Sequence, residues 1–332
     1  MTHQQPAVLE AANIRRVAIV GCGTIGASWA ALFLSRGLSV TATDTDPAAE
    51  GRLVKFLQAA WPALSSLRRS ADASDADASR LDAALERLRF DPDLQRACAD
   101  SDFVQENGPE REAIKIDLMK RIDASVRPGV IIASSSSALQ ISRLQEQCRY
   151  PGRVVLGHPF NPPHLVPLVE VVGGTATTEE AIEQAIAFYS RVGKTPIRML
   201  KEMEGHIANR LQAAVFREAV SLLDQGVASL RDIDIALTEG PGLRWALMGP
   251  FLTFHLAGGT GGIRAFFDQF SPMQRSLWAK LGSPVLDERL RQRVIQAVDE
   301  EISRLDQPAL VHWRDEAITS LVKVKQSFEK PE

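Results

Sequence analysis

A strand, a glycine turn and a second strand near the amino terminus restrict the fold more than any other feature of the sequence. Residues 14–20 (IRRVAIV) form a short apolar, β-branched run that ends at a glycine, as is typical of a buried parallel strand. Residues 24–36 then carry apolar side chains at helical spacing and stop at Gly37, and residues 38–44 (LSVTATD) repeat the strand pattern. Strand, helix and strand within about thirty residues predict the start of a doubly wound α/β sheet.

The α/β pattern continues to residue 200. Further strand patterns lie at residues 102–105, 130–134, 154–158, 166–172 and 196–200. Helical patterns fit between them at 110–126 and 178–192. From residue 205 helical patterns dominate, and they are broken at the glycine-containing stretches 240–242, 249–250 and 258–262.

These patterns predict three parts of the chain. We expect a flexible tail over residues 1–13, a Rossmann-type domain with a doubly wound, mostly parallel sheet over 14–200, and an all-helical domain over 201–332. Residues 47–97 show helical spacing with one interruption, the small and acidic stretch SADASDADAS at 70–79. Such a stretch is poorly suited to a core, so we expect an exposed loop there.

Composition and charge argue against several classes of protein. The 332 residues have a formal net charge of −3 and no basic stripe, which disfavours nucleic-acid binding. No run approaches about 18 uncharged apolar residues, so we expect no membrane span. The cysteines Cys22, Cys98 and Cys148 have no paired spacing, so we expect neither a disulfide framework nor a cysteine-based metal site. Because residues 1–13 lack a signal-peptide pattern, we expect a cytoplasmic protein.

The turn after the first strand has the dinucleotide-binding pattern G-x-G-x-x-G. Its glycines allow a tight turn, a close approach to a pyrophosphate, and packing of the helix on the strand, and the positive end of that helix faces the phosphates. Asp44 ends the second strand, 18 residues after the last glycine, where a carboxylate can bind an adenosine ribose. No arginine or lysine follows closely, which favours NAD over NADP. The residues of the motif are Gly21, Cys22, Gly23, Thr24, Ile25 and Gly26.

FAD uses the same fingerprint and stays an alternative at this point. No second dinucleotide-type motif is found in the sequence, which makes FAD the less favoured cofactor. The pattern by itself is also compatible with an ordinary glycine-rich turn beside an incidental aspartate.

Among the six histidines, His158 is the best placed to act as a base. It ends a predicted parallel strand, and ligands of open α/β sheets bind outside the carboxyl ends of the strands. Glu170 lies on the next predicted strand, close enough to pair with His158 if the segment folds back, and a buried carboxylate would orient the imidazole. The alternative is a structural histidine beside a solvated glutamate.

Two further polar features lie at useful places. The serine run 134–137 follows another strand, where a hydroxyl can bind a substrate oxygen, although serines also cap helices and form turns. Asn209 lies in the first turns of the helix entered at Gly205, where it can contact the substrate or make an interdomain hydrogen bond.

These segments together resemble the 3-hydroxyacyl-CoA dehydrogenase family. The resemblance runs from the glycine motif through GHPFNPPHLVPLVEVV (157–172) and EGHIANRL (204–211) to MGPF (248–251). It implies that His158 is the base or acid and Glu170 its partner, and that the helical domain forms a homodimer. It also implies that the substrate oxygen is held by Ser137 and Asn209, and that the NAD site includes Glu106, Lys115, Ser137 and Asn161.

Departures from the acyl-CoA members indicate a subgroup. The chain has SSSSA (134–138) where those members usually have Ser-Asn-Thr-Ser-Ser, and Pro159 where they have Phe. GPGLRWALMGP (240–250) and HWRDE (312–316) are similar to a subgroup that contains lambda-crystallin, which is L-gulonate 3-dehydrogenase, and L-carnitine dehydrogenase. The substrates of that subgroup are small free carboxylic acids.

Arg244 offers a physical reason for such a preference. A guanidinium binds a free carboxylate through two charge-assisted hydrogen bonds, which a thioester cannot accept as an anion. Alternatively, Arg244 stacks on Trp245 or pairs between subunits.

We therefore expect an NAD-dependent oxidoreductase that transfers a hydride between C3 of a small 3-hydroxy acid (L-gulonate, L-carnitine or a 3-hydroxybutyrate-like acid) and nicotinamide. One alternative is 3-hydroxyacyl-CoA dehydrogenation, which would use basic residues such as Arg52, Lys55 or Arg68. The other is a non-catalytic, crystallin-like structural protein.

Overall fold

The computed structural model describes residues 7–67, 80–303 and 305–328 of the chain. The chain divides into two compact units, one made of Met1–Ile207 with Trp313–Glu332 and the other of Ala208–His312. The exposed loop expected at residues 70–79 lies outside the described residues, as does the first part of the expected tail.

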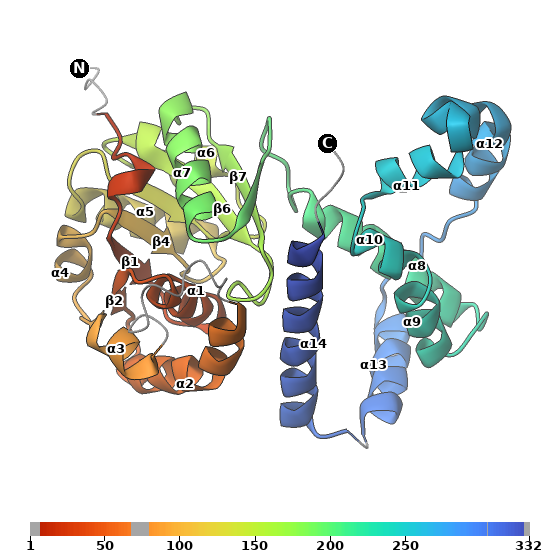
Figure 1. Ribbon diagram of the computed structural model, residues 1–332, viewed down its shortest axis with the longest axis horizontal. Coiled ribbons are helices and arrows are strands. Elements are labelled where there is room, and N and C mark those ends of the chain that lie inside the picture. The colour runs from red at the N-terminus through yellow and green to blue at the C-terminus, as the bar shows by residue number, and fades with distance from the viewer. Residues whose placement is uncertain (1–6, 68–79, 304, 329–332) are drawn as a thin grey trace. The chain divides into compact units, whose positions relative to one another are not determined.

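The first unit is built on one eight-stranded sheet with the order β3-β2-β1-β4-β5-β6-β7-β8 (Figure 1). All neighbouring strands are parallel except β6 and β7, which run antiparallel. The predicted Rossmann-type, mostly parallel sheet is therefore confirmed. The strands are β1 (Arg16–Val20), β2 (Ser39–Thr43), β3 (Leu88–Phe90), β4 (Phe103–Glu106), β5 (Ile131–Ser134), β6 (Val154–Pro159), β7 (Leu168–Gly173) and β8 (Thr195–Arg198).

Strand β3 corrects one expectation. It falls within residues 47–97, for which the sequence predicts helices, and that prediction is wrong at Leu88–Phe90. The strand has three residues and lies at the edge of the sheet, so it is too short to show the alternation by which strands are recognised.

Helices cover both faces of the sheet, and alternate residues of each strand point to opposite faces. Val17 and Ile19 of β1 belong to one core cluster, together with Trp29 of α1 and Leu53 of α2. Ala18 and Val20 of the same strand belong to the second cluster, which includes residues of α4 and α5. Because both faces are buried, the strand reads as a continuous apolar run.

The helices of this unit up to residue 191 pack around the sheet, and those that follow a strand return the chain for the next one. They are η1 (Ala11–Asn13), α1 (Thr24–Ser35), α2 (Ala49–Leu67), α3 (Leu81–Glu86), α4 (Leu94–Ala99), α5 (Glu112–Ser125), α6 (Ile141–Leu144), η4 (Pro151–Arg153), α7 (Glu179–Arg191) and most of α14 (Gln307–Ser327).

The residues just before β1 are held to the sheet unit. Val8 and Ala11 are buried in the first core cluster. The backbone N–H of Leu9 donates to the carbonyl oxygen of Gly129 at 2.8 Å, and that of Ala11 donates to the side chain of Gln184 at 2.7 Å. The described part of the segment preceding Arg16 is therefore ordered by both packing and hydrogen bonds.

The second unit is all helical and buries few of its own side chains. Its helices are α8 (Ala208–Asp224), α9 (Leu230–Thr238), α10 (Pro241–Trp245), α11 (Pro250–Ala257), η5 (Gly259–Gly261), α12 (Gly262–Trp278) and α13 (Glu288–Ile302). Phe266 and Leu290 are buried, whereas Phe251 is 87% exposed and Trp278 is 66% exposed. In the described part of the chain, no helix is both long and apolar enough to cross a membrane.

Candidate active site

The glycine turn between β1 and α1 leaves room where a ligand phosphate would lie. Gly21 has φ +88°, and a Cβ there would lie 2.7 Å from the carbonyl oxygen of Asn107. A Cβ on Gly26 would lie 1.9 Å from the carbonyl oxygen of Gly21. In contrast, a Cβ on Gly23 would meet no atom within 4 Å, and no side chain caps the N-terminus of α1 at that residue. The first N–H groups of α1 thus remain available to bind an anion.

A cavity of about 400 Å³ opens beside this turn. The carboxylate of Asp44 lies on its wall and is fixed by two backbone N–H groups, those of Cys22 (2.7 Å) and Asp46 (2.9 Å). A carboxylate so held keeps further lone pairs for ribose hydroxyls. The cavity therefore suits the adenosine part of a dinucleotide. It is lined by Val20, Gly21, Gly23, Thr43, Asp44, Thr45, Pro92, Leu94, Asn107, Gly108, Pro109, Leu118 and Arg121.

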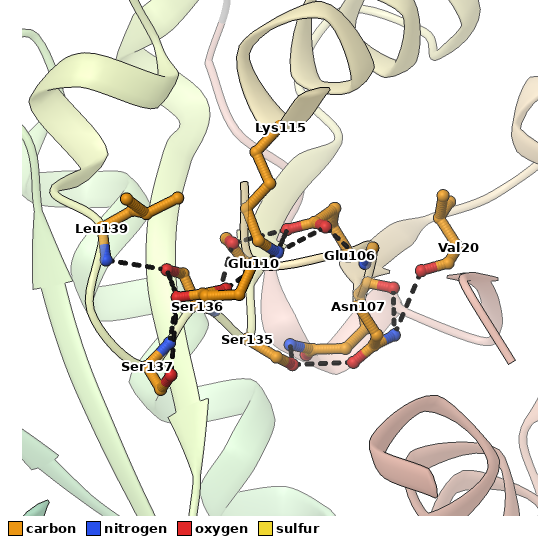
Figure 2. A network of polar contacts seen from close by, with 12 residues as sticks. Val20, Glu106, Asn107, Glu110, Lys115, Ser135, Ser136, Ser137 and Leu139 are labelled. Carbon is orange, nitrogen blue, oxygen red and sulfur yellow. Dashed lines mark hydrogen bonds and ion pairs between the residues drawn. The ribbon is translucent and has the colours of Figure 1, made fainter. Parts of the chain in front are cut away.

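Glu106 and Lys115 form a buried ion pair (Figure 2). The ammonium nitrogen of Lys115 donates to both carboxylate oxygens of Glu106, at 2.8 and 3.0 Å. Glu106 also accepts from the hydroxyl of Ser134 (2.5 Å) and the backbone N–H of Gly108 (2.6 Å). The pair thus ties β4, β5 and α5 together. Its expected contact with the cofactor stays a prediction.

Glu110 organises the serine loop and was not selected from the sequence. Its Oε1 accepts from the hydroxyl of Ser136 at 2.6 Å and from the backbone N–H groups of Ser137 (2.9 Å) and Ala138 (3.0 Å) (Figure 2). Burial raises the pKa of Glu110, but the hydrogen bond from Ser136 and the charge of Lys115 outweigh that effect, so the pKa lies below its ordinary value. Glu110 therefore remains ionised and fixes the backbone that carries Ser137.

Ser137 is exposed, with its hydroxyl 3.4 Å from the same Glu110 oxygen. Its neighbour Ser135 instead contacts Asn107, at 2.7 Å between the hydroxyl and the amide oxygen. Of these two serines, Ser137 is the one whose hydroxyl is accessible to a substrate.

The antiparallel pair β6 and β7 places His158 directly opposite Glu170. Nδ1 of His158 lies 2.9 Å from Oε2 of Glu170, and both residues are buried. Since a carboxylate only accepts, Nδ1 carries the proton and Nε2 is left as the acceptor, the tautomer that a general base requires. The other oxygen of Glu170 accepts from the backbone N–H of Ile207 at 2.8 Å.

The structure therefore brings His158 and Glu170 together as the sequence predicts, and it adds a second ring. The ring of His206 lies against that of His158, with 4.8 Å between the centroids. His206 is not among the site residues predicted from the sequence. The catalytic roles of His158 and Glu170 stay predictions.

Buried polar groups hold the loop between β6 and β7 in place. His164 is bonded to Ser28 of α1, with 2.7 Å between the ring nitrogen Nδ1 and the hydroxyl. The ammonium of Lys194 donates to the carbonyl oxygen of Pro163 at 2.6 Å. Asn161, the residue expected near the nicotinamide, is exposed in this loop.

The remaining two predicted residues belong to the second unit. Asn209 is half-buried in the first turn of α8. Arg244 is exposed in α10, and its guanidinium makes no ion pair with any residue that the structure describes. Their expected contacts with substrate stay predictions.

Comparison with known proteins places the whole arrangement in a family. Residues 16–203 match the NAD binding domain of 3-hydroxyacyl-CoA dehydrogenase, and residues 205–293 match its C-terminal domain. An L-carnitine dehydrogenase of Streptomyces coelicolor is 46% identical over 311 residues, which cover 94% of this chain and 95% of that protein. Another, from Nocardiopsis dassonvillei, is 45% identical over 96% of this chain and 94% of its own.

Solved structures agree with the family assignment. The crystal structure of 5-formyl-3-hydroxy-2-methylpyridine 4-carboxylic acid 5-dehydrogenase, described as an NAD⁺-dependent dismutase, has a TM-score of 0.79 and 28% identity. The alignment covers 95% of this chain and 100% of that one. The predicted resemblance and the NAD cofactor are confirmed by these relatives together with the glycine turn and Asp44. The chain is an NAD-dependent dehydrogenase, and it belongs to the 3-hydroxyacyl-CoA dehydrogenase family.

Proposed function

We propose that this enzyme oxidises the 3-hydroxyl group of a small free 3-hydroxy acid, L-carnitine in the first place, with NAD. The buried His158–Glu170 pair is the observation that carries the proposal, because it supplies a base with an accepting Nε2 and a partner for its proton-bearing Nδ1. The choice of L-carnitine is supported by relatives of that name that are 40–46% identical over nearly the whole chain.

The residues divide the chemistry among them. Nε2 of His158 takes the proton of the substrate hydroxyl, and Glu170 stabilises the imidazolium that forms. The hydroxyl of Ser137 and the amide of Asn209 hold the substrate oxygen as it becomes a carbonyl. NAD, held by the glycine turn and Asp44, would supply the acceptor for the hydride of the substrate C3. In the reverse direction the same His158 returns the proton to the oxygen.

Arg244 is proposed to bind the substrate carboxylate. Its guanidinium is exposed and without an ion-pair partner among the described residues, so it is available for a bidentate contact with an anion. A thioester lacks the negative charge that such a contact requires. This residue therefore favours free acids over acyl-CoA substrates.

We also propose that the protein is a cytoplasmic homodimer that associates through its helical unit. Large apolar side chains of that unit are exposed in the single chain, among them Phe251, Trp278, Val285 and Leu286. Large apolar side chains that are exposed in one chain are typical of a surface that another chain covers. The three cysteines are free thiols, as expected in a reducing compartment.

The test is to follow NADH formation by the purified protein with NAD and a matched panel of substrates. The panel contains L-carnitine, L-gulonate, free 3-hydroxybutyrate and 3-hydroxybutyryl-CoA, with D-carnitine as the stereochemical control. We expect turnover of L-carnitine that exceeds turnover of the thioester by at least about a hundredfold, since a site built for a charged group rejects the analogue that lacks it. Turnover confined to the thioester would establish acyl-CoA chemistry instead. No turnover with any member would refute the proposed substrate class.

A further inference from the structure

His206 occupies a strained position in the chain beside the proposed base. It has φ +51°, and the preceding Gly205 has φ +74°. Among the described residues, His206 is the only one with a side chain that adopts a positive φ. This region is disfavoured for residues that have a Cβ, so the contacts that the residue makes must hold it there.

The hydrogen bond of His206 determines where its proton lies. Nε2 is 3.0 Å from the carbonyl oxygen of Ser136. A carbonyl only accepts, so Nε2 carries a proton. Nδ1 is buried and has no hydrogen-bond partner among the described residues. A second proton on Nδ1 would therefore be a buried donor, and a buried charge, without a partner.

The surroundings of His206 favour the neutral ring. Burial is the largest effect and lowers its pKa, and the neighbouring His158 lowers it further. The hydrogen bond to Ser136 and the carboxylates of Glu170 and Glu110 act in the opposite direction but do not outweigh burial. The resulting pKa lies below its ordinary value, so His206 is uncharged at neutral pH.

This one residue connects three parts of the proposed site. Its ring lies 4.8 Å from that of His158, between centroids. The next residue, Ile207, donates its backbone N–H to Glu170 at 2.8 Å. Its Nε2 holds the carbonyl of Ser136, the residue before Ser137. His158, Glu170 and the serine loop therefore all contact residues 206–207.

We propose that His206 is a positioning residue whose ring fixes the distance between His158 and the backbone that carries Ser137. An apolar ring would fill the same space and would leave no buried nitrogen unpaired. An apolar ring could not donate the hydrogen bond to Ser136, and this bond accounts for a histidine at this place. Because the ring is neutral, it does not oppose the positive charge that forms on His158 when the base accepts a proton. The inference rests on the proposed role of His158.

Two substitutions separate the hydrogen bond from the packing. His206→Gln places an amide nitrogen near the position of Nε2, where it can donate to Ser136, and it cannot titrate. His206→Phe keeps a ring against His158 and removes the donor. Both new side chains are unbranched at Cβ, so both carry the same backbone strain as histidine. The thermal midpoint and the Kd for NAD serve as controls for folding and for the cofactor site.

We expect His206→Phe to lower kcat by about tenfold or more, because the serine loop loses its fixed distance from the base, and to change the Kd for NAD little. We expect His206→Gln to restore kcat to within about threefold of wild type. If folded His206→Phe keeps the wild-type kcat, or if His206→Gln fails to rescue a deficient His206→Phe, the positioning role is wrong.

A spectroscopic measurement tests the neutral ring without any substrate. In protein labelled with ¹⁵N-histidine, we expect the ring signal that disappears in His206→Gln to show a protonated Nε2 and an unprotonated Nδ1 at about pH 7. Titration of that signal near neutral pH would overturn the inference even if the His206→Phe variant does not fold. A protein that turns over no hydroxy acid but keeps this neutral signal would refute the proposed function and leave the neutral ring established.

Discussion

His164 leads to a prediction about the pH dependence of stability. Its ring is buried beneath the loop between β6 and β7, with Phe56 edge-on to it at 5.5 Å between centroids. The hydroxyl of Ser28 accepts from the backbone N–H of His164 at 2.8 Å and lies 2.7 Å from Nδ1 of the same residue. Nε2 is buried without a partner among the described residues, so a protonated ring would place a charged donor there without an acceptor. This arrangement accommodates the neutral ring only.

Burial lowers the pKa of His164 from 6.5 to about 4, with Asp315 acting against that shift and Lys194 and Arg314 adding to it. Above pH 6.5 the ring is neutral in both the folded and the unfolded chain, and its full contribution to stability is present. As the pH falls from 6.5 towards 4, the unfolded chain binds a proton that the folded chain does not. Each pH unit in this range lowers the unfolding free energy by about 1.4 kcal/mol. We therefore expect His164 to remove about 2 kcal/mol of unfolding free energy between pH 7 and pH 5.

The assay is urea unfolding of wild type and His164→Asn at both pH values. The amide of asparagine replaces Nδ1 as the partner of the Ser28 hydroxyl and does not titrate. His255→Asn, the same change at an exposed histidine, is the control. We expect the wild type and the control to lose about 2 kcal/mol more than His164→Asn between pH 7 and pH 5. Equal losses in all three proteins would show that burial does not keep His164 neutral, and the reasoning would fail.

Two predictions concern the proposed chemistry. His158→Ala should lower kcat by about a thousandfold or more, as expected for loss of a general base, and leave the Kd for NAD unchanged in a fluorescence titration; near-normal turnover would require another base. Arg244→Ala should raise KM for L-carnitine by about tenfold or more with a smaller effect on kcat, because a charge-assisted carboxylate contact is lost. The KM of Arg244→Lys should lie between those of the wild type and Arg244→Ala. An unchanged KM in Arg244→Ala would exclude the carboxylate contact.

Features formed by residues close in sequence could be predicted. The turn at Gly21–Gly26 and the carboxylate of Asp44 lie within one strand–helix–strand unit, where each residue type has a local geometric reason. His158 and Glu170 are twelve residues apart, and the strand patterns on either side of their loop indicate that the chain folds back. The edge strand β3 escaped prediction because three residues give too short a pattern.

Features that depend on distant segments could not be predicted. Glu110 organises residues 136–138 with a single carboxylate oxygen, and nothing in the spacing of the sequence relates these two loops. His206 lies in the site because its backbone has a left-handed conformation. The sequence does not indicate this conformation, because a glycine such as Gly205 precedes many ordinary helices. The bond between Ser28 and His164 joins residues 136 positions apart. Propensity and periodicity carry no information on such contacts.

The antiparallel pair of β6 and β7 separates the facing of His158 and Glu170 from the chemistry of the loop between the two strands. The partnership of His158 with Glu170 is set by the register of β6 against β7, and a slip of one residue would turn Glu170 to the opposite face. The loop that joins these strands, residues 160–167, is anchored separately through His164 and Pro163, so a change at its exposed residue Asn161 leaves the two side chains of the ladder opposed. The side chain at that position can therefore change without a change in the pairing of His158 with Glu170.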